Sequence, residues 1–164
     1  STALKRDLCT DDTKKELYNS MRELNKNASE LIEMFPVNSC TDVTGFGLLG
    51  HLKEICAASN VSANIYQSQI PLLTGVDEFA ADGIIPGGTE NNYKYLKKYV
   101  QYEPSIPVHK RQILADAQTS GGLLFTVPED SEESIIKKFE ENKLFAKAIG
   151  RIIPSEVPLI KVFS

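Results

Sequence analysis

A strand, a glycine turn and a helix follow one another within residues 38–56, and this order restricts how the chain can fold. Residues 38–43 are short and β-like, residues 44–47 contain two glycines, and the next segment carries apolar side chains at helical spacing. A strand that runs through a tight turn into a helix buries one face of each element against a shared core. The segment therefore predicts a layered structure of sheet and helices.

Helical and strand-like segments alternate along the rest of the chain. One apolar stripe, broken near residues 25–27 and ended by Pro36, predicts a helix from about residue 13. Its members are Leu17, Met21, Leu24, Ala28, Leu31, Ile32 and Phe35. Further helices are expected at 75–82, 91–100, 108–115 and 130–142, a turn at 86–89, and strands at 61–66, 123–127, 146–153 and 157–163. This mixture predicts an α+β or α/β fold in one domain, residues 1–164.

Charge and hydropathy exclude two classes of function. The formal net charge is −4, and the lysines and arginines are scattered rather than arranged in a stripe. Nucleic acid needs a basic surface, so we expect no nucleic-acid partner. No apolar run approaches the roughly 20 residues that cross a bilayer, so we expect no membrane association. The first five residues lack the layout of a signal peptide, which predicts a cytoplasmic protein.

The three cysteines, Cys9, Cys40 and Cys56, match no metal-ligand spacing. Their odd number argues against a disulfide framework and suits a reducing compartment. Cys40 and Cys56 have apolar neighbours in the sequence, so we expect both in the hydrophobic core.

The turn at residues 44–47 has the features of a phosphate-binding loop. Gly45 and Gly47 let an anion approach the backbone, and the following helix would present free N–H groups and the positive end of its dipole. Asp42 is placed where a carboxylate can hold Mg²⁺ together with phosphate oxygens. An acid beside such a loop suggests a metal–nucleotide site. The alternative is a simple helix capped by Thr44, and for an isolated short motif this alternative is commoner.

Two further polar segments carry candidate residues. Residues 116–122 either line a polar site beside the first turn or form a turn whose hydroxyls satisfy local backbone groups. The candidates in this segment are Thr119, Ser120, Gly121 and Gly122. In residues 87–92, Asn92 can bond a ligand or a facing backbone, and Thr89 is expected to cap a helix.

The histidines, His51 and His109, form no catalytic pattern. They lack the zinc-protease spacing of two histidines one helical turn apart. We expect His51 to be packed or hydrogen-bonded beside the glycine turn. His109 has basic neighbours and is expected at the surface.

Three ordered blocks of sequence, residues 42–52, 86–92 and 118–124, resemble those of the C-terminal domain of selenophosphate synthetase (selenide, water dikinase). Residues 148–152 resemble its closing strand, so the resemblance spans nearly the whole chain. Relatives in the wider aminoimidazole ribonucleotide synthetase superfamily differ around the glycines. One departure is Ala117, where the family usually has proline. The resemblance implies an α+β fold, a layered mixed sheet flanked by helices.

The resemblance also implies a function. Selenide, ATP and water give selenophosphate, AMP and phosphate in the presence of Mg²⁺. Asp42 would help to hold the metal, and Thr44, Gly45, Gly47 and residues 119–122 would lie near the nucleotide phosphates. The other metal-binding aspartates, the catalytic lysine and the reactive cysteine or selenocysteine belong to an N-terminal domain, so no catalytic residue is expected in residues 1–164. The missing domain is thus the expected partner, within a homodimer, and the isolated chain is expected to be inactive.

Two other functions remain open. The first is a non-catalytic binding domain that keeps the fold but not the reaction. The second is another ATP-dependent member of the superfamily, against which Phe46 and the block at residues 119–122 count.

Overall fold

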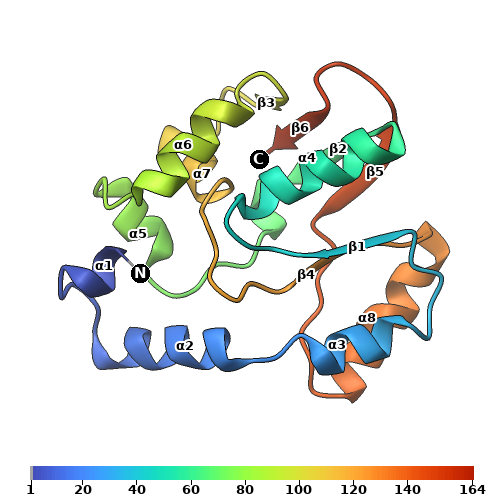
Figure 1. Cartoon of the computed structure of the whole chain (residues 1–164), viewed down its shortest axis with the longest axis horizontal. Helices are drawn as coiled ribbons and strands as arrows, with labels where there is room; N and C mark the ends of the chain where they lie inside the picture. The colour runs from blue at the N-terminus through green and yellow to red at the C-terminus, as the bar shows by residue number, and fades with distance from the viewer. Residues whose placement is uncertain (1) are drawn as a thin grey trace.

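The computed structural model describes residues 2–164 and confirms the mixture of helices and strands (Figure 1). The strands in this range are β1 (Ser39–Asp42), β2 (Val61–Tyr66), β3 (Val100–Tyr102), β4 (Leu123–Thr126), β5 (Gly150–Pro154) and β6 (Ile160–Phe163). The α-helices are α1 (Thr2–Lys5), α2 (Asp11–Arg22), α3 (Lys26–Ile32), α4 (Gly47–Ser59), α5 (Val76–Ala81), α6 (Gly87–Leu96), α7 (Val108–Ile113) and α8 (Glu132–Glu141). Two single turns, η1 (Gln67–Gln69) and η2 (Glu129–Ser131), complete the list.

The strands form two sheets. The larger has the order β3-β6-β2-β5, with β2 parallel to β6, β6 parallel to β3, and β5 antiparallel at the edge. The smaller is an antiparallel ribbon of β1 and β4, in which Asp42 lies opposite Leu123. The expected mixed sheet flanked by helices is confirmed, with the ribbon as a separate part.

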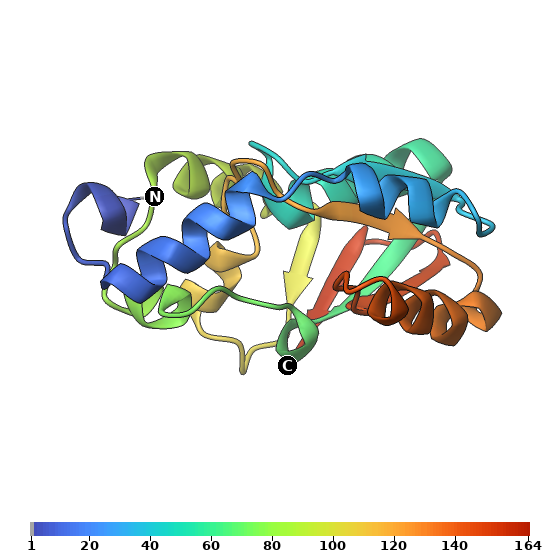
Figure 2. The same ribbon diagram turned by 90° about the horizontal axis from the view of Figure 1, so that it is seen from below.

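The main core lies between α4 and the larger sheet. Leu49, Leu52 and Cys56 of α4 are almost fully buried, and Ile160 and Val162 of β6 are buried in the same cluster. Figure 2 shows α4 on one side of this sheet and η1 with the C-terminus on the other. The apolar face predicted for residues 48–56 therefore packs α4 against the sheet. Because the glycine turn directly precedes α4, this packing also fixes the position of the turn.

A second, smaller core joins α3, α8 and the ribbon. Leu31 and Ile32 of α3 meet Ile135 and Phe139 of α8, and the Phe139 ring stacks on Phe125 of β4 at a centroid distance of 6.1 Å. The ribbon thus has packed helices on one side while its ends lead to the glycine turn and to residues 116–122 (Figure 1).

Several boundaries differ from the expectation. Residues 86–89 are not a turn, because α6 already begins at Gly87. Strand β3 was not expected and forms because Val100 and Tyr102 pair with β6, a contact between residues far apart in sequence. Strands β5 and β6 are shorter than predicted, beginning at Gly150 and Ile160.

Only part of the apolar stripe predicted from about residue 13 to Phe35 is buried in the fold. The break near residues 25–27 is confirmed, since α2 ends at Arg22 and α3 begins at Lys26. Leu31 and Ile32 are buried, but α2 buries none of its residues and Leu24 is 76% exposed. The placement of Leu24 on a buried face was wrong, because it lies in the connection where helical periodicity is lost. No helix within residues 2–164 is both long and apolar enough to span a bilayer.

Leu49→Ala should destabilise the fold by about 2–5 kcal/mol, because it opens a cavity where the side chain is fully buried. The control is Leu24→Ala, which removes the same atoms from an exposed position and should change stability by less than about 0.5 kcal/mol. Urea unfolding of both variants measures the difference. Equal effects would contradict the assignment of Leu49 to the core.

Candidate functional site

The structure brings the three polar segments of the sequence together at one end of the β1–β4 ribbon. The Val43 N–H donates to the Gly122 carbonyl (2.9 Å), and the Gln118 N–H donates to the Thr44 carbonyl (3.0 Å). From α6, the Asn92 amide donates to the carbonyl of Gly45 (2.8 Å). We call residues 42–47 the glycine loop and residues 115–122 the facing loop. The expectation that these two loops adjoin is confirmed.

Two glycines make the contact between the loops possible. Gly47 has a φ of +71°, and a Cβ there would lie 2.7 Å from the backbone of Ala115 and Asp116. At Gly121, a Cβ would lie 2.2 Å from the Val43 carbonyl oxygen. Atoms this close cannot coexist, so both positions exclude every side chain. Gly47 and Gly121 therefore have a structural reason to be glycine.

Gly45 differs from these two, because it is exposed and, apart from its neighbours in the sequence, no atom of residues 2–164 lies within 4 Å of where its Cβ would be. Neither a positive φ nor a neighbour in this chain requires glycine there. An open space at a loop glycine is what the approach of a ligand to the backbone needs. The space at Gly45 thus fits the predicted phosphate-binding loop.

The backbone N–H groups of the glycine loop support the same interpretation. Phe46 is in the right-handed helical region and Gly47 is in the left-handed one. This succession can turn neighbouring N–H groups toward a common point, as in anion-binding loops, although the Gly47 N–H already donates to the Thr44 carbonyl (3.0 Å). Within residues 2–164, the N–H groups of Gly45, Phe46 and Leu48 have no protein acceptor. The start of α4 is not fully open, however, because the Leu49 N–H donates to the Leu114 carbonyl (3.1 Å).

His51 is hydrogen-bonded, as expected, and its partner is the glycine loop. Its Nε2 accepts from the Thr44 N–H at 3.1 Å and lies 3.1 Å from the Thr44 hydroxyl. Since an N–H can only donate, Nε2 is the acceptor and the ring proton is on Nδ1. Thr44 is not the helix cap of the alternative interpretation, because that position is taken by Phe46.

Asp42 ends β1 on an exposed side of the ribbon. Its carboxylate has no hydrogen-bond or ion-pair partner within residues 2–164, and no group of three potential metal ligands exists in this range. A free carboxylate beside an open loop suits one ligand of Mg²⁺, an ion usually held by one or two carboxylates together with phosphates and water. Asp42 alone does not make up a metal site within the described residues, but its exposed carboxylate fits the chemistry of a single Mg²⁺ ligand.

Cys40 lies two residues before Asp42 on the same side of β1, and its expected burial was wrong: the residue is exposed. Strand alternation, rather than apolar sequence neighbours, decides its direction. Partial desolvation, together with the negative charge of Asp42, raises the pKa of the Cys40 thiol. Cys56 is buried as expected, and its burial raises the pKa of its thiol to about 11. Neither thiol has the lowered pKa of an activated nucleophile.

The facing loop contains both free and occupied polar groups. Thr119 and Ser120 are exposed, and their hydroxyls have no partner within the described part of the chain. The Asp116 carboxylate is occupied, because it accepts from the Gln118 amide (3.2 Å) and from the buried Thr89 hydroxyl. The prediction of Thr89 as a helix cap was therefore wrong. Pro86 holds that position, and Thr89 instead ties α6 to the facing loop.

The sequence left open whether the Asn92 side chain bonds a ligand or the facing backbone. Its Nδ2 donates to both the Gly45 carbonyl (2.8 Å) and the Ala115 carbonyl (3.1 Å), so one amide joins the two loops. Phe46, in contrast, leaves 65% of its surface exposed next to this junction. The resemblance singled out residues 86–92 as a block, but only the folded chain shows which atoms Asn92 contacts.

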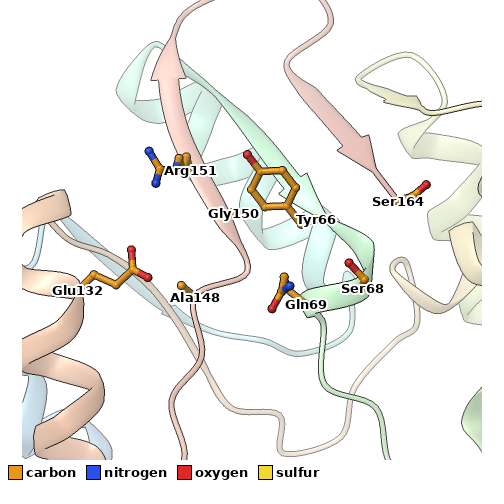
Figure 3. A pocket seen from close by; sticks show the side chains of 8 residues that line it. All are labelled: Tyr66, Ser68, Gln69, Glu132, Ala148, Gly150, Arg151 and Ser164. Carbon is orange, nitrogen blue, oxygen red and sulfur yellow. The ribbon is translucent and has the colours of Figure 1, made fainter.

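A separate hollow of about 420 Å³ lies against the larger sheet and shares no lining residue with the two loops (Figure 3). It is lined by Tyr66, Ser68, Gln69, Glu132, Ala148, Gly150, Arg151 and Ser164. Figure 3 shows Arg151 and Glu132 at one side and Ser164 at the other. None of the sequence-predicted candidates lies there.

Comparison with known proteins agrees with the fold and with the three blocks. The model of the family described as AIR synthase related protein, C-terminal domain, matches residues 1–161. This chain belongs to that family. The resemblance expected from the three sequence blocks is thus confirmed for nearly the whole length.

Within the family, the chain is similar to proteins named selenide, water dikinase. It is 37% identical to the one from Aliarcobacter butzleri over 155 residues, which are 94% of this chain and 45% of that protein. The protein from Clostridioides difficile is 40% identical over 163 residues, 99% of this chain and 47% of the relative. The chain therefore spans a little under half the length of these relatives.

One solved structure, the thiamine-monophosphate kinase from Stenotrophomonas maltophilia K279a, covers 80% of this chain and 32% of its own. Its sequence identity is 20% and the TM-score is 0.48, and nothing further is concluded from this likeness.

Gly121→Ala should destabilise this AIR synthase related domain by about 1–3 kcal/mol, because the added methyl group meets the Val43 carbonyl. Gly45→Ala should leave stability within about 0.5 kcal/mol, because the space is free. Urea unfolding compares the two variants. A Gly45→Ala variant as unstable as Gly121→Ala would show that Gly45 is required by the fold and not by a ligand.

Thiol labelling should separate two of the cysteines. At about pH 8, Cys40 should react with a disulfide reagent in the folded chain, whereas Cys56 should react only after unfolding, because it is buried and its thiol pKa is raised to about 11. Mass spectrometry of digested protein locates the label, and Cys40→Ser serves as the control. Rapid labelling of Cys56 in the folded state would contradict its place in the core.

Proposed function

We propose that this chain is the C-terminal domain of a selenide, water dikinase, which makes selenophosphate from selenide, ATP and water and releases AMP and phosphate. The observation that carries the proposal is the meeting of the three sequence blocks at one site, in a chain 37–40% identical to proteins of that name. Segments that are far apart in sequence and rich in glycine and polar residues have little reason to converge on an exposed surface other than a ligand.

The glycine loop is proposed to bind the nucleotide phosphates. This role is supported by the N–H groups of Gly45, Phe46 and Leu48, which have no acceptor within residues 2–164, and by the open space at Gly45. Thr44, through its contact with His51, holds the loop, and Gly47 lets it lie against the facing loop. On the facing loop, the hydroxyls of Thr119 and Ser120, which have no partner within residues 2–164, would donate to phosphate oxygens. Gly121 and Gly122 would add no side chain between the phosphates and the backbone of this loop.

Asp42 is proposed to bind Mg²⁺ next to these phosphates. Its exposed carboxylate lies three residues before Gly45 and has no competing partner in the described chain. The ion would offset the repulsion between this carboxylate and the phosphates and would neutralise charge on the phosphoryl group during transfer.

The rest of the catalytic machinery would come from an N-terminal domain of the same protein, within a homodimer. Phosphoryl transfer needs several charged groups around the phosphates, and this site offers one free carboxylate and backbone N–H groups. We therefore propose that residues 1–164 are a single domain that is inactive alone. Selenide-dependent turnover by the pure chain would contradict this.

Asp42→Asn in the full-length protein should lower selenide-dependent AMP formation by about 100-fold or more, because it removes the metal-binding charge but keeps the shape. The matched control is Asp12→Asn, an exposed aspartate on α2 without an ion pair in the described chain, which should leave the rate unchanged. ATP consumption is measured with and without selenide at several Mg²⁺ concentrations.

Each outcome of this experiment decides between the proposed function and one of its alternatives. An unaltered rate in a folded Asp42→Asn variant would make Asp42 a structural residue. ATP consumption without selenide dependence in the wild type would point to another ATP-dependent enzyme of the superfamily. No ATP consumption at all would favour a non-catalytic binding domain.

A further inference from the structure

The orientation of two peptide groups in the glycine loop depends on contacts with the rest of the chain. The Thr44 carbonyl is turned toward the protein, where it accepts from the N–H groups of Gln118 and Gly47, each at 3.0 Å. The Gly45 carbonyl is turned toward α6, where it accepts from the Asn92 amide at 2.8 Å. Within residues 2–164, no other hydrogen bond is made by these two carbonyls, although the Phe46 ring also packs beside His51 at a centroid distance of 5.8 Å.

A peptide group is planar, so turning a carbonyl in one direction turns the next N–H in the opposite one. The cis bond in the described chain is at Val157–Pro158, and the peptides of the glycine loop are trans. The Gly45 N–H therefore points away from the facing loop, and the Phe46 N–H points away from Asn92. These are two of the N–H groups without a protein acceptor.

Asn92 is the only side chain of residues 2–164 that holds the Gly45–Phe46 peptide. A glycine at position 45 has no Cβ to restrict rotation of this peptide, so without the amide the carbonyl could turn outward and the N–H inward. The second bond of the same amide, to Ala115, fixes Asn92 itself. Thr89, one turn earlier on α6, bonds Asp116, so the helix is anchored to the facing loop at two points.

We propose that Asn92 is a positioning residue that keeps the Phe46 N–H directed toward the bound anion, a role that rests on the function proposed above. Asn92 does not contact the ligand. It acts through the Gly45 carbonyl, and its chemistry suits this task because an amide nitrogen has two hydrogens for two carbonyl oxygens. Aspartate has the same shape but no hydrogen-bond donor, and its carboxylate would repel both carbonyl oxygens. The Asn92→Asp substitution therefore tests whether the two donated hydrogen bonds are needed.

Three variants test this role. Asn92→Ala removes the hydrogen bond, and Asn92→Asp replaces the donor by a carboxylate that repels the carbonyls. Asn91→Ala alters the exposed neighbour, whose side chain has no hydrogen bond in the described chain. In the full-length protein, KM for ATP should rise about tenfold or more in Asn92→Ala and further in Asn92→Asp, as expected for the loss of one bond to a charged group. KM for selenide should stay within about twofold, because the change concerns one phosphate contact. Asn91→Ala should match the wild type in both constants.

A second measurement, on this chain alone, does not depend on activity. In ¹⁵N-labelled protein, the amide signals of Gly45 and Phe46 should shift or broaden in Asn92→Ala and stay in place in Asn91→Ala, since the backbone peptide is released only in the former. Signals of core residues such as Leu52 should not move, which separates a local loss of order from unfolding.

The results distinguish this inference from the proposed function. Unchanged Phe46 signals together with an unchanged KM for ATP in Asn92→Ala would overturn the role of Asn92. An equal rise in both KM values, with shifted core signals, would also overturn it, because Asn92 would then be a general structural residue. If the wild type uses no selenide but Asn92→Ala still raises KM for ATP and moves the Phe46 signal, the positioning role stands and the proposed reaction fails.

Discussion

The site depends on the close backbone contact between the glycine loop and the facing loop. Gly47 and Gly121 lie where a single added carbon would collide with the opposite backbone, and the Val43–Gly122 and Gln118–Thr44 hydrogen bonds close the contact. Because the loops flank the β1–β4 ribbon and the first turn of α4, this contact also sets how the helix meets the ribbon. Asp42, Thr119 and Ser120 are brought to one exposed surface as a consequence.

Two kinds of polar group share this surface. Asn92, Thr89, Asp116 and His51 direct their hydrogen bonds to the chain itself and hold the loops. In contrast, the Asp42 carboxylate, the hydroxyls of the facing loop and the N–H groups of Gly45 and Phe46 have no partner in the described chain. Exposed groups of the second kind are free for an anion and a cation, and the first kind prevents the loops from collapsing onto them.

Much of the fold could be predicted from local patterns. The strand at residues 61–66, the helix following the glycine turn and the break near residues 25–27 were all confirmed, because apolar periodicity and glycine act within a few residues. Strand β3 was missed, since only its pairing with β6 makes it a strand. The exposure of Cys40 was mispredicted, because apolar neighbours in the sequence do not reveal which side a residue faces. That of Leu24 was mispredicted because it lies between α2 and α3, where the helical periodicity stops.

From the sequence alone came the class of fold, through the alternation of helical and strand-like segments, and the family, through the resemblance of three ordered sequence blocks to a known one. The metal-binding role of Asp42 and the phosphate contacts of residues 44–47 and 119–122 stay predictions. Only the tertiary structure decided that Gly47 and Gly121 serve the contact between loops while Gly45 leaves open space, and that Asn92 bonds two carbonyls. These distinctions depend on atoms brought together from distant parts of the chain, which no local pattern encodes.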